Sequence, residues 1–482
     1  MAPDPQPIVP GDEAGKSRVR GGPLVPCPLC RRQVEARELL ETVMRLDRDT
    51  THLVAANGPG WQPAAGLCSD CGRRFTVALG HMRRHYPRLL ATGQAILSTA
   101  ARLGASERFR GRGVTVAFLD SGFYAHPDLV EPKDRIVRYM DITRAGARRA
   151  DLDKPDASSW HGMMTSVVAC GNGRLSDGLY RGLASEARLV LVKCGTALRI
   201  AHDDIRRGLD WVLSQRKRYG IRVVNVSCGG DYEASYLTDG LSQAAEECAR
   251  NGILVCAAVG NLGHAPRHPV LPPASAPSVL TVGGLDDKNR LVPAGYELYH
   301  SSYGPTVDGL QKPEVIAPGI WVAAPILPGT TTSVQAALLL RLHAAPDADL
   351  RRIIASQPAV DPDLDAAAGL EPAVLREIVR AKIKVQNLVT AAYKHVDGTS
   401  FAAPVVTSVA AQMLEANTAL TPQELKAILI RTARRVPHAE VDRQGWGLVD
   451  PEAAVAAALA ARPRPERRRA PRVAEVLPGR KT

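Results

Sequence analysis

The chain has 482 residues, of which 45% are hydrophobic and 23% charged, and these fractions exclude both a wholly disordered chain and a fibrous repeat. Half of the net charge of +12 lies in residues 462–482, so the charge alone does not indicate a nucleic-acid-binding surface. No run approaches the roughly 18 apolar residues of a membrane helix, and the N-terminus lacks the apolar stretch of a signal peptide. We therefore expect a cytoplasmic protein with no membrane partner, long enough for two or three domains.

The N-terminal part combines an unpatterned segment with paired cysteines. Residues 1–22 are rich in Pro, Gly and charge without periodicity, so we expect them to be disordered. Residues 23–90 contain two Cys-x2-Cys pairs, and four thiolates satisfy a tetrahedral zinc ion in a domain that otherwise has little core. The sequence predicts a small zinc-binding domain with structural Zn²⁺ on Cys27, Cys30, Cys68 and Cys71.

A second ligand set is compatible with the spacing. His81 and His85 follow the second cysteine pair and would complete a two-Cys, two-His finger of a kind that binds DNA. That set leaves Cys27 and Cys30 without a role, whereas the histidines fit polar positions of a basic helix. Five further cysteines lie in apolar segments and are expected to be packing residues: Cys170, Cys194, Cys228, Cys248 and Cys256.

Short apolar runs alternate with longer amphipathic stretches from about residue 106 to 460. The runs are GVTVAFLD, ARLVLVKCG, IRVVNVSCGG, GILVCAAVGN and SVLTVGG. This alternation is typical of an α/β domain with a mainly parallel sheet. We assign residues 91–461 to this domain.

Four segments of this domain carry polar residues that strands and turns do not require. Asp120 ends the strand VTVAFLD, where a carboxylate points at the usual ligand crevice of a parallel sheet, and Asn261 follows the strand ILVCAAVG. His161 precedes the helical run MMTSVVAC. Ser400 lies in DGTSFAAP, a turn leading into a helix whose dipole favours a developing anion. Each residue alone fits a purely structural role, but the four together indicate a catalytic site.

A helical insertion and a basic tail complete the chain. Residues 329–384 are rich in Ala, Leu and Arg, with a break near PAVDPDLD. Residues 462–482 contain four prolines among eight basic residues, so we expect a disordered tail. The apolar positions with helical spacing in the insertion are Val334, Ala337, Leu338 and Leu342, then Leu375, Ile378, Val379 and Ile383.

These motifs resemble those of the subtilisin-like serine proteases, the subtilases. The order Asp, His, Ser is the subtilisin order. FLDSGFYAHPDL resembles the family's Asp motif, HGMMTSVVACGNG its His motif, VVNVSCGG its substrate strand, AAVGN its oxyanion motif and DGTSFAAPVV its Ser motif. The similarity covers about residues 106–460 apart from the insertion.

The resemblance implies a subtilisin-like three-layer fold and a serine endopeptidase acting on protein or peptide substrates through an acyl-enzyme. It assigns the triad to Asp120, His161 and Ser400, and the oxyanion hole to Asn261 and the Ser400 amide. It also implies a strand that pairs with the substrate and forms one wall of the specificity pocket: Ser227, Cys228 and Gly229.

The sequence departs from the family pattern around the histidine. Trp160 stands where the family commonly has Gly, and Met163 stands where a Thr is usual, so a hydroxyl is lost there. Cys228 replaces an apolar residue of the substrate strand, and we expect it to make the enzyme sensitive to thiol reagents without acting as a nucleophile. We expect altered packing and specificity at this end of the cleft, with the triad intact.

Two other classes of function are compatible with parts of the sequence. A catalytically silent scaffold would only display a peptide groove, and a zinc-dependent regulator would bind nucleic acid through the zinc domain and the basic tail. The complete triad and oxyanion residues argue against the scaffold, and the lack of an aromatic-rich basic face argues against single-stranded nucleic acid. We expect an intracellular peptidase, with neither signal peptide nor inhibitory propeptide, controlled by the zinc domain, the insertion or a protein partner.

Overall fold

The computed structural model describes residues 22–85, 96–293 and 295–461. The two segments expected to be disordered, residues 1–22 and 462–482, lie almost entirely outside the described residues. The domain boundary expected near residue 90 also lies outside them. Contacts within the chain separate two compact units, Met1–Arg73 and Arg74–Thr482. Each unit is described separately.

The described part of the first unit is a hairpin followed by helices. Strands β1 (Leu24–Pro26) and β2 (Gln33–Glu35) pair antiparallel. Its buried apolar side chains are few, so its core alone offers little stabilisation. Helices α1 (Ala36–Arg45) and α2 (Arg48–Asn57) and the turn η1 (Pro63–Ala65) follow, and then α3 (Ser69–His85) begins, extending into the second unit.

The second unit is built on a sheet whose order is β10-β8-β7-β6-β3-β5-β4. These seven strands run parallel, and β9 (Glu297–Leu298) joins β8 antiparallel. The five apolar runs predicted from the sequence form β3, β5, β6, β7 and β8, whereas β4 and β10 were not anticipated. The parallel strands are β3 (Thr115–Asp120), β4 (Ile136–Asp141), β5 (Arg188–Lys193), β6 (Ile221–Val226), β7 (Leu254–Ala258), β8 (Leu280–Asp286) and β10 (Val315–Pro318).

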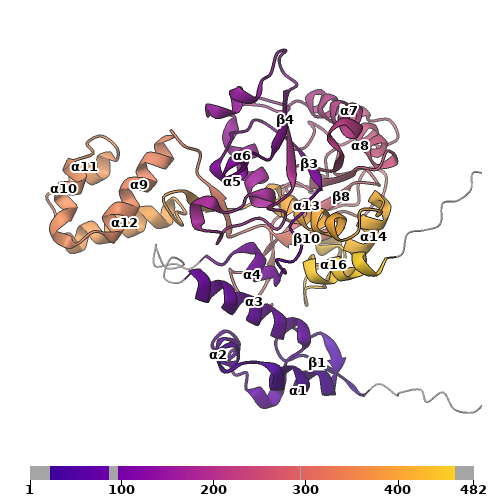
Figure 1. The fold of residues 1–482 in the computed structure, drawn as a ribbon, viewed down its shortest axis with the longest axis horizontal. Helices are drawn as coiled ribbons and strands as arrows, with labels where there is room; N and C mark the ends of the chain where they lie inside the picture. Colours follow the sequence, from indigo (N-terminus) through magenta and orange to yellow (C-terminus); the bar gives the residue numbers. More distant parts are fainter. Residues whose placement is uncertain (1–21, 86–95, 294, 462–482) are drawn as a thin grey trace, which may run out of the picture. The chain divides into compact units, whose positions relative to one another are not determined.

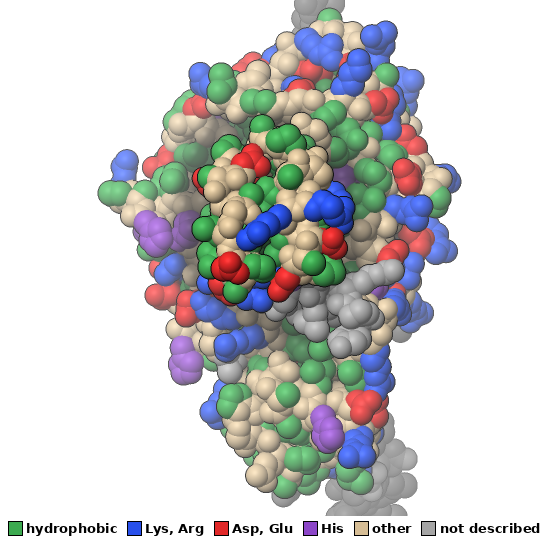
Figure 2. All heavy atoms as spheres, turned by 90° about the vertical axis from the view of Figure 1, so that its left-hand side faces the viewer, with side chains coloured by type: hydrophobic (Ala, Val, Ile, Leu, Met, Phe, Trp, Pro, Cys, Tyr) green, Lys and Arg blue, Asp and Glu red, His purple; other side chains and the backbone are tan. Residues whose placement is uncertain are grey.

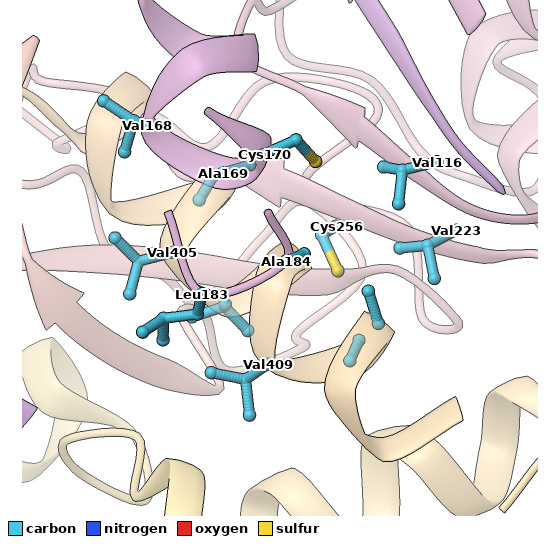
Figure 3. Close-up of a cluster of buried hydrophobic side chains, with 14 of the residues drawn as sticks. Val116, Val168, Ala169, Cys170, Leu183, Ala184, Val223, Cys256, Val405 and Val409 are labelled. Carbon is cyan, nitrogen blue, oxygen red and sulfur yellow. The ribbon is translucent and has the colours of Figure 1, made fainter. Parts of the chain in front are cut away.

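Helices cover both faces of this sheet. Along β3, Val116 and Phe118 face one apolar core and Ala117 and Leu119 face the other, because successive side chains of a strand alternate. Figure 3 shows the first core, in which helix α13 packs on the sheet. The predicted three-layer α/β fold is confirmed (Figure 1). On the first face lie α6 (Ser159–Cys170), α13 (Thr399–Ala416), α14 (Pro422–Thr432) and α16 (Pro451–Ala460), and on the second α7 (His202–Tyr219) and α8 (Gly240–Arg250).

The expected insertion is helical and has a core of its own. It is inserted in an antiparallel ribbon formed by β11 (Val322–Pro325) and β12 (Tyr393–Val396). The sequence predicted a helical insertion with a break, and four helices are present. The exposed side chains of Val334 and Ala337 correct the expected apolar face of the first one. Leu338 and Leu342 are buried as expected. The helices are α9 (Thr331–Ala344), α10 (Leu350–Ala355), α11 (Pro362–Ala367) and α12 (Pro372–Val385).

The insertion carries equal numbers of acidic and basic residues. Figure 2, in which the insertion faces the reader, shows charged side chains of both signs interspersed with hydrophobic ones. This surface therefore offers no broad basic patch of the kind that binds nucleic acid. Within the described part of the chain, every helix is too short or too polar to span a bilayer.

Candidate active site

The site is organised around a buried carboxylate at the end of the central strand β3. Asp120 has no exposed surface, and its Oδ1 atom lies 2.8 Å from Nδ1 of His161 in the first turn of α6. The backbone N–H of Ser121 donates to the same oxygen at 2.8 Å. A buried charge is tolerated only when such donors surround it. The contact therefore brings together two residues that are 41 positions apart in the sequence.

The hydrogen bond fixes the tautomer of the imidazole. An ionised carboxylate can only accept, so Nδ1 of His161 carries the proton and Nε2 of the neutral ring is left with a lone pair. Burial lowers the pKa of His161, but the charge of Asp120 and the hydrogen bond raise it, and the net shift is upward. His161 is thus prepared to accept a proton at Nε2.

Gly162 allows the helix to approach the strand this closely. A Cβ atom on Gly162 would lie 2.2 Å from the carbonyl oxygen of Gly122 and 2.9 Å from Cβ of Asp120.

The imidazole of His161 also contacts an aromatic ring. Trp160 is 46% exposed and meets the His161 ring edge to face, with ring centroids 5.1 Å apart. The Trp160 side chain therefore lies directly beside the imidazole.

The hydroxyl expected to be missing beside His161 is supplied from another position. Thr165, one helical turn after His161, donates to Oδ2 of Asp120 at 3.2 Å. Met163, which occupies the usual position of the hydroxyl, is fully buried in the core. Sequence reasoning missed Thr165 because it compared single positions rather than residues on one helical face.

Ser400 is the second residue of helix α13. Its hydroxyl donates to the carbonyl oxygen of Ser227 at 3.2 Å, and the hydroxyl of Ser227 donates to the carbonyl oxygen of Ser400 at 2.9 Å. Among the described residues, no hydrogen bond joins Ser400 to His161. Catalytic hydrogen bonds in free enzymes are often long or poorly aligned and tighten only when the substrate binds.

A polar residue inside a buried strand supports the contact between Ser227 and Ser400. Asn225 in β6 has no exposed surface, donates to Oγ of Ser227 at 2.9 Å, and accepts from the hydroxyl of Thr407 at 3.0 Å. The chain of hydrogen bonds runs from the middle of α13 through β6 to Ser400. Asn225 was missed, although an Asn within the apolar run IRVVNV is a signal that could have identified it.

Asn261 contacts the turn that precedes Ser400. Its side-chain oxygen accepts from the backbone N–H of Thr399 at 3.0 Å and from the hydroxyl of Thr399 at 2.8 Å. This orients the carboxamide and leaves the Nδ2 group without an acceptor among the described residues. Gly398, with φ of +134°, keeps the space beside Nδ2 open, since its Cβ would lie 3.7 Å from that atom.

A pocket of about 250 Å³ opens beside Ser400. The expected substrate strand, Ser227 to Gly229, forms part of its lining, and the half-buried Cys228 is included. None of the described residues in the lining is charged, so the pocket suits a neutral side chain. The lining consists of Ser227, Cys228, Gly229, Gly230, Ala258, Val259, Gly260, Asn261, Leu262, Pro269, Leu271, Ser302, Thr399 and Ser400.

Of the cysteines other than Cys228, four are packing residues of the second unit and four lie close together in the first unit, as expected. Cys170, Cys194, Cys248 and Cys256 are buried, and burial raises the pKa of each thiol. The half-buried thiol of Cys228 likewise has a pKa raised well above its ordinary value by burial. These thiols are therefore weak nucleophiles.

In the first unit, four sulfur atoms lie within 4.8 Å of one another. Cys27 and Cys30 belong to the turn after β1, and Cys68 and Cys71 lie at the start of α3. A zinc ion with four Zn–S bonds of about 2.3 Å places its sulfur atoms about 3.8 Å apart. The Sγ atoms of Cys30 and Cys68 are 3.6 Å apart, close to this separation, and the four cysteines could hold a metal ion.

The alternative set with His81 and His85 is not assembled. Within the described residues, the four cysteines are the group of possible ligands that lie close together, and neither histidine belongs to it. The sequence predicted polar positions of a basic helix for the histidines; His81 and His85 lie in helix α3, and both are buried. Burial lowers the pKa of His81 to about 4, so it is neutral at physiological pH.

Comparisons with known proteins agree with this geometry. Residues 111–447 match the model of the subtilase family, Peptidase_S8. Serine protease AprX of Bacillus subtilis (strain 168) is 27% identical over 402 residues, which cover 81% of this chain and 76% of AprX. Subtilisin BL of Lederbergia lenta is 29% identical over 239 residues, which cover 49% of this chain and 74% of that protein.

The fold is also found among solved structures. A protease structure from Pseudoalteromonas arctica PAMC 21717 has a TM-score of 0.50 and 24% sequence identity to this chain. The match covers 79% of this chain and 97% of that one. It supports the architecture of the second unit.

Proposed function

The chain belongs to the subtilase family of serine-type endopeptidases, and on that premise we propose that Asp120, His161 and Ser400 form its catalytic triad. The observation that carries the proposal is the 2.8 Å contact of His161 with a fully buried Asp120. It is supported by the position of Ser400 at the start of a helix, beside an uncharged pocket. The substrates are proteins or peptides.

In this proposal His161 acts as the general base. Nε2 takes the proton of the Ser400 hydroxyl as Oγ attacks the peptide carbonyl, and the imidazolium then gives that proton to the leaving amine. Asp120 holds the ring and stabilises its charged form. Water then attacks the acyl-enzyme by the same route, which regenerates the free Ser400 hydroxyl. The hydroxyl must first turn away from the carbonyl oxygen of Ser227.

The oxyanion is held by the Nδ2 group of Asn261 and the backbone N–H of Ser400. The orientation imposed by Thr399 supports this role, because it leaves Nδ2 free to donate. The substrate pairs as an extended strand with residues 227–229 and places one side chain in the pocket. The neutral lining and a volume of about 250 Å³ favour an apolar side chain before the cleaved bond.

The four cysteines of the first unit bind one structural zinc ion in this proposal. When bound, the ion crosslinks the β1–β2 turn to the start of α3 and offers no open position for catalysis. Nine unpaired cysteines, all at described positions, support residence in a reducing compartment such as the cytoplasm. Regulation by the zinc unit or a protein partner remains part of the proposal.

The insertion is proposed to control access of large substrates. Its first residue, Gly329, lies near Pro155 in the loop that leads to His161, because a Cβ on Gly329 would lie 3.9 Å from Cγ of Pro155. Its other end continues through β12 into the turn that carries Ser400. Movement of the insertion would therefore reach both catalytic segments.

We expect Ser400→Ala to abolish labelling by a fluorophosphonate and all peptidase activity, while the exposed Ser214→Ala leaves both unchanged. Asn261→Ala should retain labelling and lower kcat by roughly 10²- to 10³-fold, because one oxyanion donor is lost. Active-site labelling and turnover of a peptide amide measure these effects. Wild-type kcat in Asn261→Ala, on a substrate whose acylation is slow, would contradict the oxyanion assignment.

The pH profile tests the pairing of Asp120 with His161. Since only the neutral imidazole accepts a proton, kcat/KM should fall with decreasing pH through a pKa above the ordinary histidine value. Asp120→Asn removes the groups that raise the pKa and leaves the burial that lowers it, so the acid limb should move to lower pH. The rate should also fall by about 10⁴-fold. An acid limb that stays in place in Asp120→Asn would show that another group titrates.

Elemental analysis of the purified protein should find one zinc ion per chain. Cys27→Ser should lose the metal and expose residues 23–73 to proteolysis, because a small core depends on its crosslink. His81→Ala is the matched control and should retain zinc. If zinc were kept in Cys27→Ser and lost in His81→Ala, the histidines would be the metal ligands and the four-cysteine assignment would be wrong.

Replacing residues 329–384 with a short Gly/Ser linker should leave the protease domain folded, because the insertion packs mainly within its own core. Activity toward a large folded protein should change more than activity toward a tripeptide amide. Circular dichroism establishes the fold, and the two kcat/KM ratios give the comparison. Equal changes on both substrates would refute the gating role.

A further inference from the structure

A segment that precedes the family-matched region is bound into the catalytic domain. Ile96 and Leu103 are each 1% exposed, and the short helix α4 (Thr99–Leu103) ends this segment. The backbone N–H of Leu97 donates to Asn289 at 2.9 Å, and the hydroxyl of Tyr180 donates to the carbonyl oxygen of Ile96 at 3.2 Å. Because this segment lies before residue 111, the family match assigns it no role.

Arg102 of α4 carries a completely buried guanidinium group. Its Nη1 atom lies 2.6 Å from Oδ1 of Asp287, which is also buried, and this pairing offsets the cost of removing the charge from water. Two further hydrogen bonds reach successive backbone carbonyls: Nη1 donates to the carbonyl oxygen of Ile320 at 3.0 Å and Nη2 to that of Trp321 at 3.2 Å. The planar fork of the guanidinium group allows Arg102 to bind the carboxylate and both carbonyls at once.

The turn that Arg102 grips is strained. Trp321 has φ of +60°, a region that bulky residues rarely occupy and that costs of the order of 1 to 3 kcal/mol. Its indole N–H donates to Asp286 at 3.0 Å, and its ring lies against His395, with centroids 4.8 Å apart. Such a conformation persists only where several contacts impose it, and Arg102 supplies one of them through the carbonyl oxygen of Trp321.

The strained turn touches the backbone that delivers the nucleophile. The carbonyl oxygen of Gly319 accepts a hydrogen bond from the N–H of Gly398 at 2.8 Å. The next residue, Thr399, is held by Asn261. The backbone immediately before Ser400 is thus fixed by the turn on one side and by the proposed oxyanion residue on the other.

We propose that Arg102 is a positioning residue of the active site, which holds the Gly319–Trp321 turn and thereby the backbone of Gly398 that orients Ser400 relative to Asn261. The inference rests on the proposed roles of Ser400 and Asn261. A displacement of about 1 Å at a reacting group can reduce the rate about 100-fold. Loss of the hydrogen bonds of Arg102 to the turn therefore lowers kcat more than it changes KM, because neither Arg102 nor the turn lines the pocket beside Ser400.

The chain offers a close control for this test. Lys312 is also buried and also contacts one carboxylate and two carbonyls: Glu314 at 2.7 Å, Ala276 at 2.9 Å and Val279 at 3.1 Å. Neither these partners nor Lys312 belongs to the Gly319–Trp321 turn. Lys312→Met therefore removes a comparable buried cation without releasing the turn.

The experiment compares Arg102→Met, Arg102→Lys, Trp321→Phe and Lys312→Met in the full chain, with Ser400→Ala as the inactive reference. Thermal unfolding, kcat and KM on a peptide amide, and the rate of fluorophosphonate labelling are measured for each. Both Met variants should unfold at lower temperature. Only the changes at Arg102 and Trp321 should lower kcat and the labelling rate, by roughly 10- to 100-fold at Arg102, with KM nearly unchanged.

Each alternative result has a distinct meaning. If folded Arg102→Lys and Trp321→Phe retain the wild-type kcat, or if Lys312→Met loses as much kcat as Arg102→Met, the positioning role is overturned. If Arg102→Met does not fold, Arg102→Lys and Trp321→Phe decide the question. If Ser400→Ala retains activity, the proposed triad fails instead, and this outcome is separate from any result at Arg102.

Discussion

The buried carboxylate of Asp120 is the constraint on which the rest of the site depends. A carboxylate with no access to water is stable only where donors replace its hydration, and the end of β3 provides them from the backbone of Ser121, the ring of His161 and the hydroxyl of Thr165. The last two belong to one face of α6, and that helix can approach only because Gly162 has no side chain. The hydrogen bond that helps to stabilise the charge of Asp120 therefore also fixes the orientation of His161.

Much of this arrangement could be predicted from the sequence because the informative patterns are local. Apolar runs of five to seven residues identify the strands, and polar residues at their ends identify Asp120 and Asn261 as candidates. The segment DGTSFAAP likewise locates Ser400 at the start of a helix. The four sulfur atoms of the first unit were recognised from spacing alone, since two Cys-x2-Cys pairs in one short segment are typical of a metal site.

The remainder depends on contacts between distant segments. An Asn within the apolar run IRVVNV draws attention to Asn225, but nothing near it reveals that it connects to α13 directly and through Ser227, because Ser400 and Thr407 lie more than 170 positions away. Strand β4 was missed because Arg138 and its neighbours interrupt the apolar pattern at the edge of the sheet. The burial of His81 and His85 was also not predicted, because a helix rich in arginine gives no local sign that part of it is buried.

The separation of the catalytic segments along the chain has a consequence for biosynthesis. The residues that contact Asp120 are synthesised early, whereas the helix that carries Ser400 follows the seven parallel strands of the described sheet and the whole insertion. Parallel strands and the contacts of Ser227 with Ser400, 173 positions apart, form only after both partners have left the ribosome. A nascent chain therefore lacks the proposed triad until α13 has been synthesised, so the ribosome and neighbouring polypeptides are not exposed to the peptidase before that point.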